Sequence, residues 1–318
     1  MENKLLIGCH VSAAGGVWNA PKNAALLECE TFQIFTRPPM GGPAPKIDQE
    51  AIEKFKEEME KYKFTDFVVH CPYIVNFGSA KKTTFKASIS IVSEELKRAN
   101  SLGAKLVMTH LGSFKDLGQE KGMKQAQKGF VEVLEKYEKA AKNPETEFLL
   151  EISAGSGEVI GDTFEELAEL MEPLKKFKTF GGICFDTQHA FSSGYDIRTP
   201  ASVKDTFTKF NKIIGLKWLK MSHINDSKID LGGKKDRHEH IGEGKIGEKG
   251  FGVLLEFFST LTHGSVRNTL SVPQKRDISP LKGEKNNVAF GSFPLILETE
   301  HDKVKKDIEI LKKLRNKK

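Results

Sequence analysis

Residues 147–187 contain the repeating unit that decides the fold. Residues 147–153 read EFLLEIS, residues 163–178 read TFEELAELMEPLKKFK and residues 182–187 read GICFDT. The first and last runs are short and rich in Leu, Ile and Phe, as expected for strands covered on both faces. The run between them is amphipathic, with apolar residues at helical spacing. The stretch therefore predicts a strand, a helix and a second strand.

The same unit recurs along the whole chain. The expected strands are 5–12, 31–36, 67–71, 105–110, 147–153, 182–187, 218–223 and 293–299. The expected helices are 17–28, 48–62, 83–102, 122–142, 163–178, 200–214, 248–262 and 301–315. Eight strand–helix units in strict alternation predict a (β/α)8 TIM barrel, because eight is the number that closes this fold. The alternative is an open, doubly wound parallel sheet.

Length and composition agree with one large globular unit. The chain has 318 residues, of which 38% are hydrophobic and 29% charged, which excludes a wholly disordered protein. We expect residues 1–318 to form a single TIM-barrel domain, since such barrels reach about 250 residues or more. Residues 263–293 contain Gly, Ser, Asn and Pro and interrupt the last unit, so we expect a surface insertion there.

The net charge of +6 lies at one end of the chain. Residues 303–318 hold eight Lys and Arg against two Asp and Glu, and the remainder carries 41 of each. We expect residues 312–318 to be a basic, solvated tail, so the charge alone does not indicate nucleic-acid binding. No run approaches the ~18 apolar residues of a membrane helix, and the first residues lack a signal-peptide core. Four cysteines without a Cys-x-x-Cys pair favour an intracellular, reducing compartment, either cytoplasm, nucleus or virus-infected cytosol.

Residues able to bind metal ions recur where predicted strands end. The intervals from His70 to His110, Glu151, Asp186 and His223 are 40, 41, 35 and 37 residues, each about one strand–helix unit. In a closed barrel such residues converge on one mouth, where barrel enzymes have their active sites. The full set of candidate ligands is His70, His110, Glu151, Asp186, His189, His223, Asp236, His238 and Glu298.

These nine candidates combine five imidazoles with four carboxylates. A single histidine at a strand end usually forms only a hydrogen bond, but four converging carboxylates repel one another unless cations are bound. The histidine-rich set favours zinc over magnesium, and nine ligands suit two or three ions. We expect His10 to face the mouth and support the ligands, and His240 is a possible competing ligand.

Several longer motifs accompany the candidate ligands. They are GCHVSAAGG at 8–16, DTQHAF at 186–191, GYDIRTP at 194–200, HINDS at 223–227, DRHEHIGEGKIG at 236–247 and LET at 297–299. In this order and spacing, they resemble the endonuclease IV family of zinc-dependent apurinic/apyrimidinic (AP) endonucleases. The resemblance covers most of the chain, and the departures include Leu111, Ile152-Ser153 and Gln188.

The resemblance implies three zinc ions. The first would be bound by His70, His110 and Glu151, the second by Glu151, Asp186, His223 and Glu298, and the third by His189, Asp236 and His238. Glu151 and Glu298 would orient the attacking nucleophile. The implied reaction is hydrolysis of the phosphodiester 5′ to an abasic site in double-stranded DNA, leaving a 3′-hydroxyl, with 3′-end trimming as a side activity. The resemblance implies no organic cofactor and no membrane, and we expect a monomer.

The resemblance also indicates DNA contacts. Tyr73 and Ile74 match wedge residues that occupy the gap left by the extruded abasic nucleotide. The family often has an arginine that penetrates the base stack at the position of Met40, and Arg37 is the candidate to replace it. Pro38 and Pro39 stiffen this stretch.

Two other functions remain open on the sequence alone. One is a metal-dependent sugar isomerase or epimerase of the related barrels, which generally use carboxylates with few histidines. The other is a barrel that binds DNA or a partner after losing catalysis, although all nine ligand positions are filled.

Overall fold

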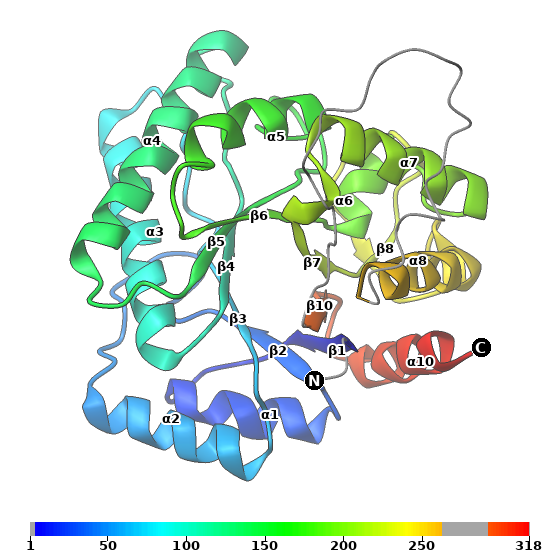
Figure 1. The fold of residues 1–318 in the computed structure, drawn as a ribbon, viewed down its shortest axis with the longest axis horizontal. Coiled ribbons are helices and arrows are strands. Elements are labelled where there is room, and N and C mark those ends of the chain that lie inside the picture. Colours follow the sequence, from blue (N-terminus) through cyan, green and yellow to red (C-terminus); the bar gives the residue numbers. More distant parts are fainter. Residues whose placement is uncertain (1–3, 263–291, 318) are drawn as a thin grey trace, which may run out of the picture.

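The described residues form a closed barrel of eight parallel strands. The computed structural model describes residues 4–262 and 292–317. The strands are β1 (Lys4–His10), β2 (Thr31–Ile34), β3 (Val68–His70), β4 (Leu106–Thr109), β5 (Glu147–Glu151), β6 (Phe180–Cys184), β7 (Leu219–His223) and β10 (Ser292–Leu297). Their order is β1-β10-β7-β6-β5-β4-β3-β2, and β1 closes the barrel by pairing with both β10 and β2 (Figure 1). The predicted TIM barrel is confirmed, and the open sheet is excluded.

Helices surround this barrel, as the outer ribbons of Figure 1 show. They are α1 (Ala20–Leu26), α2 (Gln49–Lys61), α3 (Lys82–Leu102), α4 (Gln119–Ala140), α5 (Phe164–Met171), α7 (Pro200–Ile213), α8 (Gly247–Thr262) and α10 (Val304–Asn316). Short 3-10 turns occupy Val17–Asn19, Glu172–Leu174 and Leu216–Trp218. Local chemistry sets helix ends: Pro200 opens α7 behind the Thr199 cap, and Gly103 ends α3 with φ 87°.

Two small elements at the mouth were not predicted. The short helix α6 (Thr187–Ser192) follows β6. The antiparallel pair β8 (Asp226–Ser227) and β9 (His238–Glu239) follows β7. Both elements come after the carboxyl end of a barrel strand, which is where barrel enzymes build their sites.

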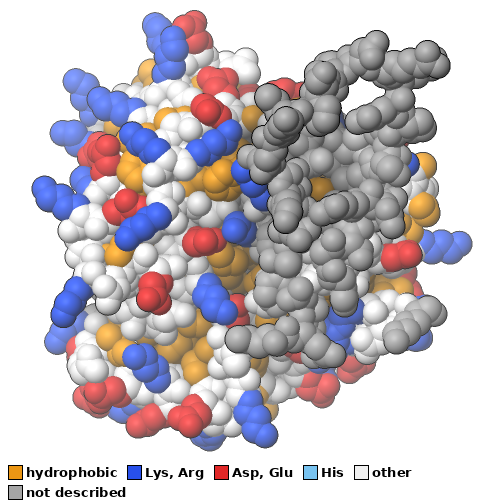
Figure 2. Space-filling view, in the orientation of Figure 1, with side chains coloured by type: hydrophobic (Ala, Val, Ile, Leu, Met, Phe, Trp, Pro, Cys, Tyr) orange, Lys and Arg blue, Asp and Glu red, His pale blue; other side chains and the backbone are white. Residues whose placement is uncertain are grey.

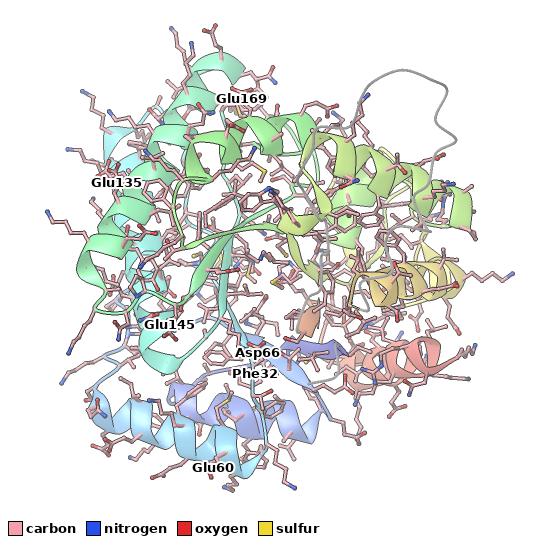
Figure 3. All side chains as sticks on the ribbon, in the orientation of Figure 1. Phe32, Glu60, Asp66, Glu135, Glu145 and Glu169 are labelled. Atoms are coloured by element: carbon pink, nitrogen blue, oxygen red, sulfur yellow. The ribbon has the colours of Figure 1, made fainter. Side chains whose placement is uncertain are left out.

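Apolar side chains form two clusters, one inside the barrel and one between the barrel and the helices. One cluster contains Val68, Leu106, Met108, Leu149, Cys184, Met221 and Ile296 from the strands alone. A larger cluster lies between the strands and the helices and includes Phe32 and Phe55. Figure 3 shows Phe32 within the ring of helices, and Glu60 and Glu135 on outer helices. This packing makes the barrel a solid support for the loops at its mouth.

Two peripheral segments were predicted, an insertion at 263–293 and a basic tail at 312–318. Residues 263–291 of the expected insertion lie outside the described residues, whereas Ser292 and Phe293 begin β10. Lys312 and Arg315, at the start of the predicted tail, belong to α10, in agreement with the helix predicted at 301–315. Arg315 donates to the Leu5 carbonyl over 2.8 Å and to Glu30 Oε1 over 3.0 Å. These contacts fasten the last helix to the start of the barrel.

The surface charge is mixed. On the described part of the face in Figure 2, Lys and Arg side chains are interspersed with Asp and Glu. Across residues 4–262 and 292–317, no helix is both long and apolar enough to cross a membrane.

Candidate metal centre

Six candidate ligands lie at the carboxyl ends of barrel strands. His70, Glu151 and His223 are the last residues of β3, β5 and β7. The other three lie just beyond strands: His110 and Glu298 directly follow β4 and β10, and Asp186 is the second residue after β6. Because the strands are parallel and closed, these side chains converge on one mouth, as the sequence spacing predicted.

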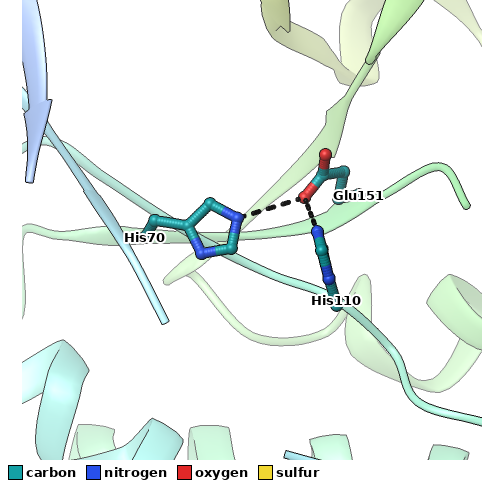
Figure 4. A group of neighbouring side chains, drawn as sticks. All are labelled: His70, His110 and Glu151. Carbon is teal, nitrogen blue, oxygen red and sulfur yellow. Dashed lines mark ion pairs between the residues drawn. The ribbon is translucent and has the colours of Figure 1, made fainter. Parts of the chain in front are cut away.

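The first group is drawn in Figure 4. His70 Nε2 lies 3.6 Å from Glu151 Oε2, and His110 Nε2 lies 3.4 Å from the same oxygen. Their ligand atoms all lie within 4.8 Å of one another. His70 and Glu151 are buried, whereas the His110 side chain is 32% exposed. The group is therefore open to the mouth on the His110 side.

The second group shares Glu151 with the first. It also contains Asp186, His223 and Glu298, again with ligand atoms within 4.8 Å of one another. His223 Nδ1 lies 2.8 Å from Glu151 Oε1 and 3.3 Å from Glu298 Oε2. Glu151 therefore presents one oxygen to each group, which is the geometry required of a bridging carboxylate.

The third group combines α6 with the loop beyond β7. His189 Nε2 lies 3.3 Å from Asp236 Oδ2, and His238 Nε2 lies 3.4 Å from Asp236 Oδ1. Asp186 is also close to this group, with its Oδ2 3.9 Å from His238 Nε2. The structure thus brings together the three residues expected for a third ion and places Asp186 between the second and third groups.

Opposing effects set the ionisation of the cluster. Burial favours the neutral form of Glu151, but His223 and His110 hold its pKa well below its usual range. Burial likewise opposes ionisation of Glu298, yet His223 lowers its pKa to about 2. Burial lowers the pKa of His110 to about 4. These carboxylates are therefore ionised at neutral pH and need compensating positive charge.

Four buried atoms in the cluster lack a hydrogen-bond partner among the described residues. They are His70 Nε2, Glu151 Oε2, His189 Nε2 and His238 Nε2. His70 Nδ1 donates to the Cys71 carbonyl, and His189 Nδ1 donates to the Ile152 carbonyl over 2.9 Å. With Nδ1 donating, Nε2 of each ring faces the cluster, where a neutral ring would offer its lone pair to a cation. The donor set and its unpaired atoms fit bound metal cations.

Two supporting residues were missed in the sequence. Gln33 on β2 accepts from His223 Nε2 over 2.8 Å and donates to Glu298 Oε1 over 2.6 Å. Asn225 donates to Asp186 Oδ2 over 2.8 Å and accepts from the Glu298 backbone amide over 2.8 Å. A buried glutamine inside an apolar strand was the available signal for Gln33. Asn225 lies in the HINDS motif at 223–227, but the motif alone gave it no role.

The two weaker histidine candidates have different surroundings. His10 Nδ1 lies 3.1 Å from Gln33 Nε2, so His10 faces the mouth and supports the ligands indirectly. His240 instead pairs with Asp307 on α10, with Nδ1 2.7 Å from Oδ2, and with Asp302. This pairing removes His240 from the ligand set.

Cys184 is a further residue near the second group. Its thiol lies within reach of Glu151 and His223, and burial raises its pKa to about 11. Burial thus favours its neutral thiol form.

The expected DNA contacts occupy the rim of the mouth. Tyr73 and Ile74 are 45% and 40% exposed, and the Tyr73 ring centre lies 5.5 Å from that of His70 and 5.4 Å from that of His110. The Tyr73 amide donates to the Pro39 carbonyl over 3.0 Å, so the loop that carries the exposed Met40 adjoins this loop. An exposed apolar rim therefore borders the first ligand group.

Arg37 is placed differently from the prediction. Its side chain is buried and forms ion pairs with Glu95 and, over 2.7 Å, with Glu94 on α3. These carboxylates hold the guanidinium inside the protein, so the structure argues against Arg37 as a residue that enters DNA. Met40 is 79% exposed at the position the resemblance gives to the penetrating arginine.

Comparison with known proteins defines the class first. The family model for a xylose isomerase-like TIM barrel matches residues 21–261. A D-tagatose 3-epimerase-like protein shares the fold, with a TM-score of 0.66, 19% identity, and coverage of 98% of this chain and 97% of that one. The protein is thus a xylose isomerase-like TIM barrel with a candidate metal centre at its mouth.

Closer relatives identify the family. A probable endonuclease 4 from Nitrosopumilus maritimus is 41% identical over 253 residues, which cover 79% of this chain and 88% of the relative. The crystal structure of endonuclease IV from Thermus thermophilus has a TM-score of 0.74 and 25% identity, over 97% of this chain and 98% of that one. The chain belongs to the endonuclease IV family. This confirms the assignment made from the sequence motifs and favours it over the isomerase or epimerase alternative.

Proposed function

We propose that this protein is a zinc-dependent AP endonuclease of DNA base-excision repair. It hydrolyses the phosphodiester 5′ to an abasic site in double-stranded DNA and leaves a 3′-hydroxyl. The observation that supports this most is the mouth itself, where nine candidate histidine and carboxylate ligands lie together and four buried atoms have no hydrogen-bond partner among the described residues. Such a site in a chain of the endonuclease IV family favours metal-assisted hydrolysis of a phosphodiester.

The proposed ligand sets follow the three groups. His70, His110 and Glu151 hold one ion, Glu151, Asp186, His223 and Glu298 a second, and His189, Asp236 and His238 a third. Five imidazoles among nine ligands favour zinc over magnesium, which prefers oxygen. When bound, the zinc ions supply Lewis acidity and lower the pKa of water toward ~7.

Glu151 and Glu298 are the proposed catalytic residues. Glu151 is fully buried and held ionised, so it can bridge two ligand groups without moving. The Glu298 side chain is 10% exposed and accepts a hydrogen bond from Gln33, and the Glu298 backbone amide donates to Asn225 Oδ1. Its carboxylate is thus fixed at the solvent edge of the second group, where it can orient the attacking water for an in-line approach to phosphorus.

DNA recognition is assigned to the apolar rim. Tyr73 and Ile74 are proposed to fill the gap beside an extruded abasic nucleotide, which costs little to unstack because it lacks a base. Met40, on the adjoining loop, contributes an apolar side chain to the same rim. The protein is proposed to act on intracellular DNA as a monomer, since the ligands and the rim all come from one chain.

Incision of a duplex that carries one tetrahydrofuran abasic analogue tests this function. The analogue cannot undergo β-elimination, so any cut is hydrolytic. We expect 5′ incision without added magnesium, and loss of incision after pre-incubation with a strong zinc chelator. Absence of incision by folded, zinc-loaded protein contradicts the proposal, and turnover of a ketose by the same sample indicates the isomerase alternative instead.

A further inference from the structure

Asp226 is a buried carboxylate at the mouth that belongs to none of the ligand groups. It lies on β8 and is fully buried. Within residues 4–262 and 292–317, no Lys, Arg or His forms an ion pair with it, and no group of metal-capable residues includes it. A buried carboxylate needs compensating hydrogen bonds, and the partners of Asp226 reveal its role.

Backbone amides surround the Asp226 carboxylate. Oδ1 accepts from Ser227 over 2.8 Å and from Ile246 over 2.9 Å. Oδ2 accepts from Gly242 over 3.0 Å, from Gly244 over 3.1 Å and from Gly247 over 3.1 Å. Four of these five amides belong to residues 242–247. The carboxylate therefore fixes the path of the chain immediately after the loop that carries Asp236 and His238.

Ser227, the residue next to Asp226, also fixes the start of the loop that carries Asp236 and His238. Ser227 on β8 pairs directly with His238 on β9. The Lys228 amide donates to the Arg237 carbonyl over 3.0 Å, and the Lys245 amide donates to the Ser227 carbonyl over 2.8 Å. We call residues 228–247 the ligand loop. Both of its ends are thus held by contacts with Asp226 and Ser227.

The sequence of the ligand loop is adapted to this close contact. A Cβ atom at Gly244 would lie only 2.5 Å from Asp226 Oδ1. Gly242 and Gly247 adopt φ angles of 85° and 75°, which other residues rarely reach. The glycines of the GEGKIG stretch, residues 242–247, therefore permit the amides to converge on the carboxylate.

We propose that Asp226 is a positioning residue that places Asp236 and His238 for the third metal ion. This inference rests on the proposed function. The strand-end ligands are held by the barrel, so they do not depend on Asp226. The ligand loop contains one two-residue strand, β9, and is held at Lys235 by Gln188 and Ser192 of α6. After His238, its path depends on the hydrogen bonds that the Asp226 carboxylate accepts.

Asp226→Asn tests the proposal, because it keeps the shape and replaces an accepting oxygen with a donating amide. We expect the protein to retain about two of about three zinc equivalents. We expect kcat to fall by roughly 10- to 100-fold, the usual effect of losing a residue that orients a metal ligand, with KM for abasic DNA unchanged. Excess zinc should restore part of the activity, because all nine ligands remain.

Two further variants make the result specific. Gly244→Ala pushes a methyl group against the carboxylate without changing any charge, and should reproduce the zinc loss and its rescue. Asp66→Asn is the matched control, because Asp66 is a buried carboxylate that pairs with Lys105 and Ser292 just before β3, away from the mouth. It should retain the full zinc content.

The outcomes separate this inference from the proposed function. Full zinc content and normal incision in Asp226→Asn would overturn the positioning role alone. So would an unfolded Asp226→Asn protein combined with a Gly244→Ala protein that binds zinc normally. If the wild-type protein bound zinc but did not incise abasic DNA, the proposed function would fail. Zinc loss in Asp226→Asn, together with faster amide hydrogen exchange at 242–247, would still support the positioning role in that case.

Discussion

The strand-end ligands and the ligand loop are positioned by different forces. Glu151 and His223 end strands whose backbone hydrogen bonds run around the closed barrel, and both are fully buried. Asp236 and His238 lie on the ligand loop, with side chains that are 48% and 19% exposed. A side chain that ends a barrel strand acquires its position from the fold, whereas one on a loop needs dedicated hydrogen bonds.

This difference has a chemical consequence. The barrel supplies six candidate ligands in fixed positions, and the fold alone, which the D-tagatose 3-epimerase-like protein shares, does not determine the chemistry. The ligand loop and α6 add His189, Asp236 and His238, which complete the histidine-rich set. The loop region therefore distinguishes this metal centre from a barrel site that contains only strand-end ligands.

The largest expected effect on incision is at Glu151, the strand-end residue that two of the proposed ligand groups share. Glu151→Gln should lower incision by about 1,000-fold, because the neutral amide removes the one carboxylate common to two groups in a buried site. Zinc content, measured by plasma mass spectrometry, should fall while the circular dichroism spectrum stays that of the native fold. Glu147→Gln is the control, since Glu147 begins the same strand at the opposite end of the barrel. Unchanged turnover in Glu151→Gln would contradict the metal assignment.

A smaller effect is expected on the ligand loop. His238→Gln should remove about one zinc equivalent and lower incision by roughly 100-fold, leaving the strand-end ions bound. Unlike Asp226→Asn, this variant lacks a ligand, so excess zinc should not restore it. His301→Gln, an exposed histidine beyond β10, serves as the control. Loss of all zinc from His238→Gln would show that the two regions bind metal as one unit.

The smallest effect is expected at the rim, which contains no proposed ligand. The double change Tyr73→Ala and Ile74→Ala should weaken binding to abasic DNA by about tenfold, as expected for the loss of a stacking contact. Zinc content should stay at the wild-type level. Leu26→Ala removes an exposed apolar side chain from the end of α1 and should leave DNA binding unchanged. Zinc loss in the double variant would instead assign Tyr73 to support of His70 and His110.

The strand–helix units, which repeat along the chain, were predictable from the sequence. All eight barrel strands lie at or within a few residues of the predicted runs, because each is an apolar segment followed by an amphipathic helix. The convergence of His70, His110 and Glu151 followed from the same period, since equal spacing in a closed barrel places residues at one mouth.

The features that were missed depend on short elements or distant partners. The strands β8 and β9 have two residues each, too few for a pattern, and α6 has only six. Arg37 was expected at the DNA, but its partners Glu94 and Glu95 lie nearly sixty residues away in the sequence. The amide contacts of Asp226 were likewise invisible, because backbone groups leave no signature in the sequence.

The pairing of β1 with β10 links the order of synthesis to activity. Six residues of β1, from Lys4 to Cys9, pair with β10, and Glu298 follows β10 directly. The first barrel strand in the sequence therefore closes the barrel only when the last one is present. The proposed catalytic carboxylate Glu298 arrives in the same step. A chain interrupted before residue 292 lacks the strand that closes the barrel and, with it, the proposed catalytic carboxylate.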